Sequence, residues 1–363
     1  MSKIYLYNDL YLPTFPYLDI PLYNELKLKN PSSYYILQAG DIRLFDKILM
    51  EKYMSLNPII VKNIQEIPNL VGKDDLLIQR FCYKNSGGTV MAIAKSKSKK
   101  VLALDPAAVD VAFRTCDARY LAVKSEWMKS QVIKKYPAQY EKIFVTGTIH
   151  FDSSLNIMAN KKQFMESYGL DTNKKLVIVC KAHPGEMGQQ KNVDNEYKDI
   201  IKIINNKCQQ YEFLFKAHPS DYSIDLPQIP GVIHKGAVYN NCASWRVLFP
   251  EGIKVVKPEE GYLSFACADL VINVRSSIGM ETPLFPVPLI NVNSHKYLVN
   301  WPKVNINGVM KNIEMKDLEK CLNNNDYCAD KDACDKYVLK YCDPENNRKS
   351  YIRIADVAVG LLK

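Results

Sequence analysis

Short apolar runs alternate with longer helical patterns along most of the 363-residue chain. This alternation is the feature that most constrains the fold, because it is typical of parallel sheets whose strands are connected by helices. Helical patterns lie near residues 89–97, 125–136, 195–207, 262–268, 316–324 and 347–362. The runs that we expect to form strands are residues 3–7, 32–38, 57–63, 75–81, 99–105, 119–125, 141–147, 174–182, 211–217, 230–236, 268–274 and 286–292. The sequence therefore predicts an α/β protein.

A chain of this length is too long for one ordinary hydrophobic core and suits two domains. The segment DSSLNIMANKKQ, at residues 152–163, follows a strand pattern and is the best place for a boundary. We therefore expect domains at residues 1–155 and 156–346, followed by a C-terminal helix at residues 347–363. Ligands of open parallel sheets bind beyond the carboxyl ends of the strands, so functional residues should directly follow strands.

The composition is that of a globular protein, with 47% apolar and 24% charged residues. The sequence contains no apolar run of about 18 residues, which a membrane-spanning helix needs. The start, MSKIYLYNDLYLP, lacks the apolar centre of a signal peptide, so we expect a cytoplasmic protein. The ten cysteines form no C-x-x-C pair, which favours reduced thiols over disulfides or a zinc site.

The formal net charge is +9, from 48 Lys and Arg against 39 Asp and Glu. This excess favours phosphate-bearing ligands or anionic membrane surfaces, and peripheral association with the inner face of a membrane stays open. The charge is spread along the chain, with one dense run, KSKSKK, at residues 95–100. Nucleic acid is not an expected partner, because no recognised nucleic-acid module accompanies the charge.

Four strand exits in the second half of the chain carry polar side chains. Two of them are His-Pro segments, KAHPGE and KAHPSD, in which proline restrains the residue before it. Each imidazole is thereby held at a defined angle, from which it can donate to a phosphate or to a base edge. A turn histidine bonded to a neighbouring carbonyl explains either segment alone, whereas several exits at one sheet edge favour a binding site. The side chains are Lys181, His183 and Glu186; Lys216, His218, Ser220 and Asp221; His234 and Lys235; and Arg275, Ser276, Ser277 and Glu281.

The fourth exit reads RSSIGME, at residues 275–281. Where a strand exit opens a helix, unpaired backbone N–H groups can bind an anion, and small hydroxyl residues let it approach closely. Ser276 and Ser277 fit such a phosphate site, and they fit helix N-caps equally well. Glu281 complements a helix dipole only weakly, which favours a role in accepting bonds from sugar hydroxyls. Pro283 indicates a short turn rather than a long helix.

Two strand exits in the first half are further candidates. Ser86, Gly87 and Gly88 follow the strand pattern of residues 75–81, where glycines let a ligand approach the backbone; a tight turn explains them nearly as well. Asp105 leaves a strand beside a proline and fits either a general base for an acceptor hydroxyl or a helix N-cap. The sequence contains no P-loop, dinucleotide-binding, zinc-protease or serine-hydrolase motif.

Several of these segments resemble the superfamily of GT-B glycosyltransferases and their relatives, the UDP-N-acetylglucosamine 2-epimerases. YEKIFVTGTIHFDSSL, at residues 140–155, is similar to V-T-G-N-x-x-x-D-x-L, with Asp152 at the aspartate. LVIVCKAHPGE, at residues 176–186, resembles L-V-T-x-H-R-x-E. FLFKAHPSD, at residues 213–221, resembles the second His-Pro of epimerases and the K-x-H-P of bacterial sialyltransferases and glycerophosphotransferases. RSSIGMETPLFPVPLINVN, at residues 275–293, is similar to S-S-S-G-I-x-E-A-P-x-x-G-V-P-V-I-N-I.

The resemblance implies two facing Rossmann-like domains with a deep cleft between them and a C-terminal helix that crosses back onto the first domain. It implies that Ser276 and Ser277 hold phosphates, that Glu281 holds the ribose, and that His218 lies beside the nucleotide. The similarity is good over residues 120–293 and poor before them.

The chain departs from the epimerases at LALDPAAVD, residues 102–110, where they carry H-x-E-A-G-x-R, and at KNSGGT, where they have a G-D-T turn. The acids that move a proton at the sugar C2 are therefore not evident, and a glycosyltransferase fits better. We expect metal-independent and cofactor-independent transfer of a sugar from a nucleotide-sugar to a glycan or lipid-linked acceptor. Lys216 or Arg275 would offset the diphosphate charge, Asp105 would be the base, and His183 would stabilise the leaving group.

Other interpretations of the same residues stay open. A UDP-N-acetylglucosamine 2-epimerase or a nucleotide-sugar hydrolase would use His183 and Glu186 directly and would consume its substrate without an acceptor. A polyol-phosphate transferase of the CDP-glycerol type is a further alternative. The last alternative is a non-catalytic nucleotide-binding protein with a degenerate site.

Overall fold

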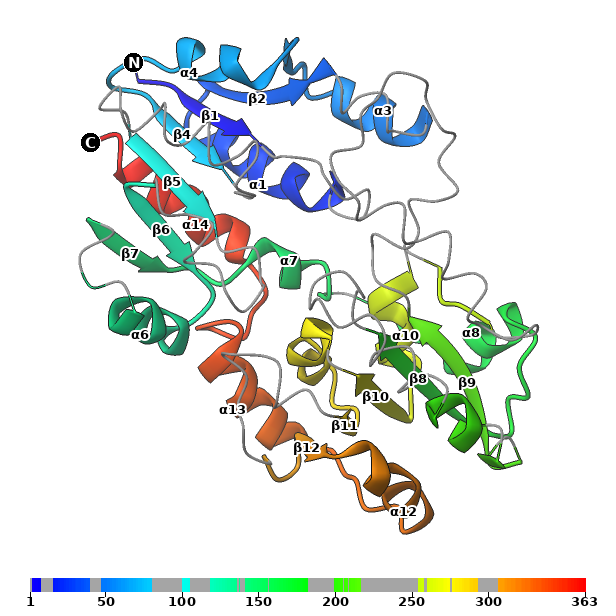
Figure 1. The fold of residues 1–363 in the computed structure, drawn as a ribbon. Helices are drawn as coiled ribbons and strands as arrows, with labels where there is room; N and C mark the ends of the chain where they lie inside the picture. The colour runs from blue at the N-terminus through cyan, green and yellow to red at the C-terminus, as the bar shows by residue number, and fades with distance from the viewer. Residues whose placement is uncertain are drawn as a thin grey trace. The chain divides into compact units, whose positions relative to one another are not determined.

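The computed structural model divides into two compact units, residues 1–155 together with 338–363, and residues 156–337. Each unit contains one parallel sheet with helices packed on it (Figure 1). The residues that the structure describes are 2–7, 16–39, 47–79, 100–104, 118–135, 137, 141–155, 157–181, 199–204, 206–207, 209–216, 254–257, 260–274, 276–292 and 306–363.

The first unit contains a seven-stranded parallel sheet in the order β3-β2-β1-β4-β5-β6-β7. Its strands are short and almost continuously apolar, because a parallel sheet that is covered by helices buries both faces. They are β1 (Ile4–Tyr7), β2 (Ser33–Gln38), β3 (Ile59–Val61), β4 (Leu76–Gln79), β5 (Lys100–Leu104), β6 (Tyr120–Val123) and β7 (Lys142–Val145).

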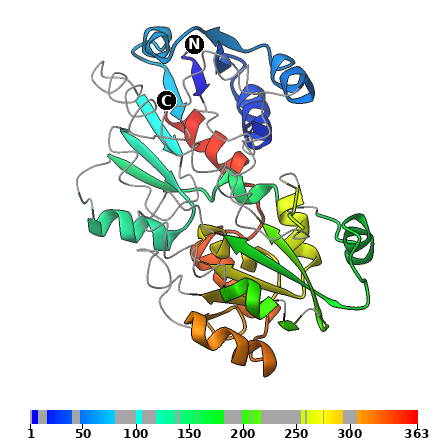
Figure 2. The same cartoon turned by 45° about the vertical axis from the view of Figure 1, so that its right-hand side comes forward.

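Helices of the first unit cover both faces of this sheet, with one apolar cluster on each face. The C-terminal helix α14 supplies Ile354, Ala355 and Ala358 to the same cluster as Leu22 and Leu26 of α1. The two helices lie side by side in both views (Figures 1 and 2). The helices are α1 (Pro16–Lys29), α3 (Lys47–Met54), η1 (Ile64–Glu66), α4 (Ile67–Leu70), α6 (Glu126–Lys135), α7 (Ile149–Asp152) and α14 (Ser350–Gly360).

Polar contacts also hold α14 to the first unit. The Asp152 carboxylate accepts the backbone N–H groups of Ser350, at 3.0 Å, and of Tyr351, at 2.9 Å. Gly147 has a φ of +78°, and a Cβ at this position would lie 2.3 Å from Oγ of Ser350 and 2.7 Å from Nη2 of Arg353. The VTG segment therefore packs directly against the start of the helix, and only glycine permits this contact.

The second unit contains a five-stranded parallel sheet in the order β12-β11-β10-β8-β9. A parallel bridge between Phe215 and Val255 adds residues 254–256 outside β9. If the described strands are numbered by their order in the chain, with residues 254–256 as the third, their order across the sheet from that edge is 3-2-1-4-5-6. The strands are β8 (Lys175–Lys181), β9 (Tyr211–Lys216), β10 (Leu270–Val274), β11 (Leu289–Val292) and β12 (Met310–Ile313).

Among the described residues of the second unit, helices and short 3₁₀ turns lie between the strands. Residues 199–204 and 206–207 are also helical. The other elements are α8 (Lys161–Ser167), α10 (Gly261–Cys267), η6 (Ser277–Met280), η7 (Thr282–Leu284), η8 (Met315–Asp317), α12 (Leu318–Asn323) and the start of α13 (Lys331–Tyr341).

The predicted fold class is confirmed, since both sheets are parallel and are interleaved with helices. The strand expected at residues 230–236 and the helix expected at 89–97 lie outside the described residues. The sequence did not predict α1, α3, α8, α13 or β12. Contacts place the return of the chain to the first unit at Val338, within α13, whereas the sequence-based boundary is residue 347.

Six cysteines lie in the described part of the chain, and all six are free thiols. Five of them are buried and Cys328 is exposed. Among the helices that the structure describes, none is long and apolar enough to cross a membrane.

Candidate functional site

The strand order of the second unit defines a switch point between β8 and β10. From β8 the chain builds the sheet first towards β9 and then, in the opposite direction, from β10 to β12. Ligands of open parallel sheets bind beyond the carboxyl ends of the strands at such a point, because the connections leave in opposite directions there. The RSSIGME segment follows β10 directly and therefore begins at this position.

A polar row crosses the second sheet close to the carboxyl ends of its strands. Neighbouring members are in register, so all five side chains project from one face. Apolar residues such as Val179 and Ile272 alternate with the row and form the core on the other face. The row, which we call the polar row, consists of Lys216, Cys180, Asn273, Asn291 and Asn312.

The centre of the polar row is a buried pair of amides. Asn273 and Asn291 are both 0% exposed, and Nδ2 of Asn273 donates to Oδ1 of Asn291 at 2.9 Å. The same Nδ2 donates to the backbone carbonyl of Ser276 at 2.9 Å. A Cβ added to Gly279 would lie 2.3 Å from Nδ2 of Asn273, so the turn after β10 rests on the amide pair.

The turn after β10 is short, as Pro283 predicts, and consists of the 3₁₀ turns η6 and η7. Ser276 is the N-cap of η6, and its Oγ accepts the N–H of Ile278 at 3.4 Å. The capping role that the sequence allowed for Ser276 is therefore present. Ser277 is the first residue of η6.

Glu281 lies at the end of η6 with 6% of its surface exposed. One carboxylate oxygen, Oε2, accepts the hydroxyl of Tyr262 of α10 at 2.5 Å. The Tyr262 ring packs against Phe265 and Phe285, with ring centroids 6.4 and 5.8 Å away. A buried carboxylate needs such donors, because removal from water is costly for a charge.

Lys216 ends β9 and lies over the start of α10. Its Cε lies 3.1 Å, and its Nζ 3.6 Å, from the position that a Cβ of Gly261 would take. Burial raises the pKa of the neighbouring Cys180 thiol to about 12; the charge of Lys216 opposes this shift, and that of Glu281 adds to it. Cys180 is thus a neutral thiol near both charged groups, and the structure brings Lys216 and Glu281 to one region.

The structure therefore brings three of the predicted site residues together, Lys216, Ser276 and Glu281, and gives the backbone of Ser277 beside them. The remaining candidates lie outside the described residues, and their roles stay predictions: Asp105, His183, Glu186, His218, Arg275, Ser86, Gly87 and Gly88. Among the described residues, no three His, Cys, Asp or Glu side chains form a group that could hold a metal ion.

Sequence reasoning missed Tyr262, Asn273, Asn291 and Gly279. A usable signal for the asparagines was the tripeptide Ile-Asn-Val, which occurs in both β10 and β11. An asparagine inside an apolar strand of a parallel sheet requires a hydrogen-bond partner, and a second one in the next strand is the obvious candidate. Tyr262 had no comparable signal, because its bond to Glu281 depends on the packing of α10.

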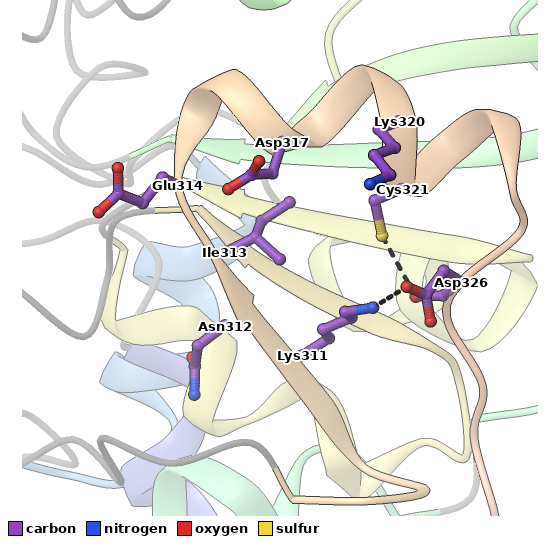
Figure 3. A pocket seen from close by; sticks show the side chains of 8 residues that line it. All are labelled: Lys311, Asn312, Ile313, Glu314, Asp317, Lys320, Cys321 and Asp326. Atoms are coloured by element: carbon purple, nitrogen blue, oxygen red, sulfur yellow. Dashed lines mark hydrogen bonds and ion pairs between the residues drawn. The ribbon is translucent and has the colours of Figure 1, made fainter.

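A separate pocket of about 370 Å³ lies beside β12 and α12, at the edge of the sheet opposite to β9 (Figure 3). Inside it, the ammonium group of Lys311 pairs with the carboxylate of Asp326. The Cys321 thiol donates to the backbone carbonyl of Asp326 at 3.2 Å. None of the predicted site residues lines this pocket.

The chain matches no protein-family model and no curated protein. Its fold is similar to that of solved structures at low identity. The UDP-GlcNAc 2-epimerase of Neisseria meningitidis, bound to UDP-GlcNAc, is 12% identical over 99% of this chain and 100% of that chain, with a TM-score of 0.67. The Staphylococcus aureus MnaA–UDP structure is 12% identical over 98% and 95%, with a TM-score of 0.62. A variant of the wall teichoic acid polymerase TagF, soaked with CDPG, is 13% identical over 99% and 88%, with a TM-score of 0.52.

These similarities extend over nearly the whole chain, and identity of 12 to 13% carries information about the fold alone. The parallel sheets of the two units agree with them, since the second sheet has the Rossmann-type strand order. The chain therefore has the two-domain GT-B fold, which is shared by GT-B glycosyltransferases and UDP-N-acetylglucosamine 2-epimerases.

Proposed function

We propose that the protein is a metal-independent glycosyltransferase that moves a sugar from a nucleotide-sugar to a glycan or lipid-linked acceptor. The observation that carries this proposal is the set of polar groups at the switch point of the second sheet. The turn that begins at Ser276, together with Glu281, follows β10 at the switch point, where nucleotides bind in open parallel sheets. Lys216 ends β9, the strand next to β8. Similar folds have been solved with UDP, UDP-GlcNAc and CDPG, which supports a nucleotide-linked donor.

Each group has a role that follows from its chemistry. The ammonium group of Lys216 would offset the charge of the diphosphate, and the backbone N–H of Ser277, the first residue of η6, would bind one of its oxygens. The Glu281 carboxylate would accept hydroxyls of the ribose. Fixed donors of this kind stabilise the departing diphosphate without a metal ion, because their positive ends already point to where negative charge develops.

The residues outside the described part of the chain complete the proposed mechanism. His218 and Arg275 would flank the nucleotide, and His183 would stabilise the leaving group. Asp105 would remove the proton from the acceptor hydroxyl. The loop with Ser86, Gly87 and Gly88 follows β4, which lies beside β1 at the corresponding switch point of the first sheet.

A thermal-shift panel of UDP-, GDP-, CMP-, CDP- and TDP-linked sugars tests the donor assignment. A ligand at about 100 times its Kd stabilises the folded state by roughly 2.7 kcal/mol, which is readily measured. Glu281→Gln and Ser277→Ala should remove the shift, whereas Glu319→Gln, a change at a side chain that is 50% exposed on α12, should retain it. No shift with any compound, or full shifts in both site variants, would contradict the proposal.

A UDP-N-acetylglucosamine 2-epimerase or a nucleotide-sugar hydrolase is the second candidate, because epimerases are among the proteins of similar fold. Incubation of the binding nucleotide-sugar without acceptor separates the two. An epimerase would form the C2 epimer and a hydrolase would release the free sugar, whereas a transferase should leave most of the donor intact. Rapid acceptor-free conversion would overturn the transferase assignment and keep the donor site.

A further inference from the structure

The amide of Asn273 has a defined orientation because both acceptors near its Nδ2 need a donor. Nδ2 lies 2.9 Å from Oδ1 of Asn291 and 2.9 Å from the carbonyl oxygen of Ser276. A flipped amide would direct its oxygen at the backbone carbonyl oxygen of Ser276, which can only accept, and this is unfavourable. Both amides are fully buried, in the middle of strands whose other side chains are apolar. Such burial is costly unless the groups are bonded, so it indicates a role beyond filling space.

The bond from Asn273 determines how the first peptide of the turn is oriented. The carbonyl of Ser276 points to the sheet, where it also accepts the N–H of Gly279 at 3.3 Å. No cis peptide bond occurs in the described part of the chain. In a trans peptide the C=O and the N–H point in opposite directions. The N–H of Ser277 therefore points away from Asn273 and away from the sheet.

The turn cannot move closer to the sheet or tilt freely, since it already touches the amide pair. A Cβ at Gly279 would lie 2.3 Å from Nδ2 of Asn273 and 2.9 Å from Oδ1 of Asn291. Oγ of Ser276 also accepts the N–H of Ile278 within the turn. These contacts link the orientation of the turn to two side chains that a ligand would not touch.

We propose that Asn273 is a positioning residue for anion binding. Its amide holds the carbonyl of Ser276 against the sheet and thereby directs the N–H of Ser277 to a phosphate oxygen of the ligand. Asn291 fixes Asn273 by accepting its second amide hydrogen. The inference rests on the proposed donor site, and it adds a buried residue that acts on the ligand only through the turn.

The substitution Asn273→Asp tests this role with an almost unchanged shape. The ionised carboxylate has no hydrogen to donate and would face two oxygens. For UDP, CDP or pyrophosphate, whichever binds the wild type, calorimetry at about pH 8 should show binding weakened roughly tenfold or more. At about pH 5 a protonated carboxyl donates one hydrogen again, so the ratio of wild-type to variant affinity should fall. A general effect of a new carboxylate would instead appear equally when the same change is made elsewhere in the polar row.

Asn312→Asp is the matched control, because it makes the same change in the same polar row, at the edge strand β12. It should bind the probe as the wild type does, and circular dichroism should show both variants folded. If Asn273→Asp does not fold, Asn273→Ser replaces it: its hydroxyl is too short to reach the Ser276 carbonyl, and binding should fall by a similar factor while Asn312→Ser binds normally.

Wild-type affinity in the Asn273 variant, equal losses in it and its Asn312 control, or, for Asn273→Asp, a loss that does not vary with pH would overturn the inference and leave the donor site intact. A wild type that binds neither these probes nor any nucleotide-sugar would overturn the donor site, and this inference with it.

Discussion

The carboxylate of Glu281 is buried, and the hydrogen bond from Tyr262 offsets part of the cost of removing it from water. The hydroxyl of Tyr262 donates to Oε2 at 2.5 Å, and its ring is held by Phe265 and Phe285. A carboxylate oxygen fixed in this way has a defined direction before a ligand arrives. Defined geometry lowers the entropy that binding must remove, which favours affinity.

Replacing Tyr262 by Phe removes the hydroxyl and retains the ring. A hydrogen bond to a charged group contributes about 1.5–3 kcal/mol, so we expect a lower free energy of unfolding and weaker binding of the nucleotide-sugar. Denaturant titration and calorimetry measure the two effects. Tyr168→Phe is a matched control, since Tyr168 donates to Glu260 at 2.5 Å in the same unit. The control should lose stability and keep its affinity; unchanged affinity in Tyr262→Phe would exclude an orienting role.

Positions of single residues relative to strand ends could be predicted from the sequence, and contacts between strands could not. Lys216, Ser276 and Glu281 were predicted because a strand exit is visible in the sequence as the end of an apolar run. The Asn273–Asn291 pair depends on strand neighbours and register, which no single apolar run contains. The bond between Tyr262 and Glu281 depends on how α10 packs.

At the scale of elements, α14 is the clearest case of a distant segment completing a unit. Its apolar residues join the core beside α1, and its first turn is bound by Asp152 of α7. Burial raises the pKa of Asp152 to about 6, although the N–H groups of Ser350 and Tyr351 oppose the shift. The first turn of α14 is therefore bound by a carboxyl group that takes up a proton more readily in the folded protein than in the unfolded chain.

The stability that Asp152 contributes should fall with rising pH. Its pKa is 3.8 in the unfolded chain and about 6 in the folded protein, so the folded state binds the proton more tightly. The contribution is full below about pH 4 and is lost by about pH 6. The difference in unfolding free energy between wild type and Asp152→Asn should therefore decrease by about 2 kcal/mol over this range. Asp356→Asn, at a side chain that is 60% exposed on α14, is the control. A constant or growing difference in denaturant titrations would contradict the expectation.

Elements were predicted where their patterns were simple and missed where two signals conflicted. The described strands other than β12 were found because buried parallel strands are short apolar runs. Helix α1 was missed because it begins at Pro16 and contains Pro21, which normally indicate helix starts and breaks. The edge strand β12, Met-Lys-Asn-Ile, has polar residues at its centre and no apolar run.

At the scale of the whole molecule, both units contain a parallel sheet, but only one of them is formed by a continuous stretch of the chain. The second unit is a single continuous segment, residues 156–337, whereas the first is assembled from residues 1–155 and 338–363. Two Rossmann-like halves could be predicted from the alternation of strands and helices. The discontinuity followed only from the resemblance, because the pattern of a helix does not indicate what it packs against.

Fragments of the chain should differ in their ability to fold. Residues 156–341, which keep α13 whole, should unfold cooperatively on heating, since they contain a complete sheet and core. Residues 1–155 should not, because α14 covers part of their core. Adding residues 338–363 as a separate peptide should restore a cooperative transition in circular dichroism. A cooperative transition of residues 1–155 alone would show that α14 is dispensable.

The binding of α14 by Asp152 has a consequence for biosynthesis. Translation delivers the seven strands of the first sheet early, yet residues 338–363 must leave the ribosome before that sheet can bury its apolar face against α14. The second unit is therefore fully synthesised at residue 337, before the first unit has received its last helix. The apolar face that α14 covers therefore remains exposed in the nascent first half while the second half is made.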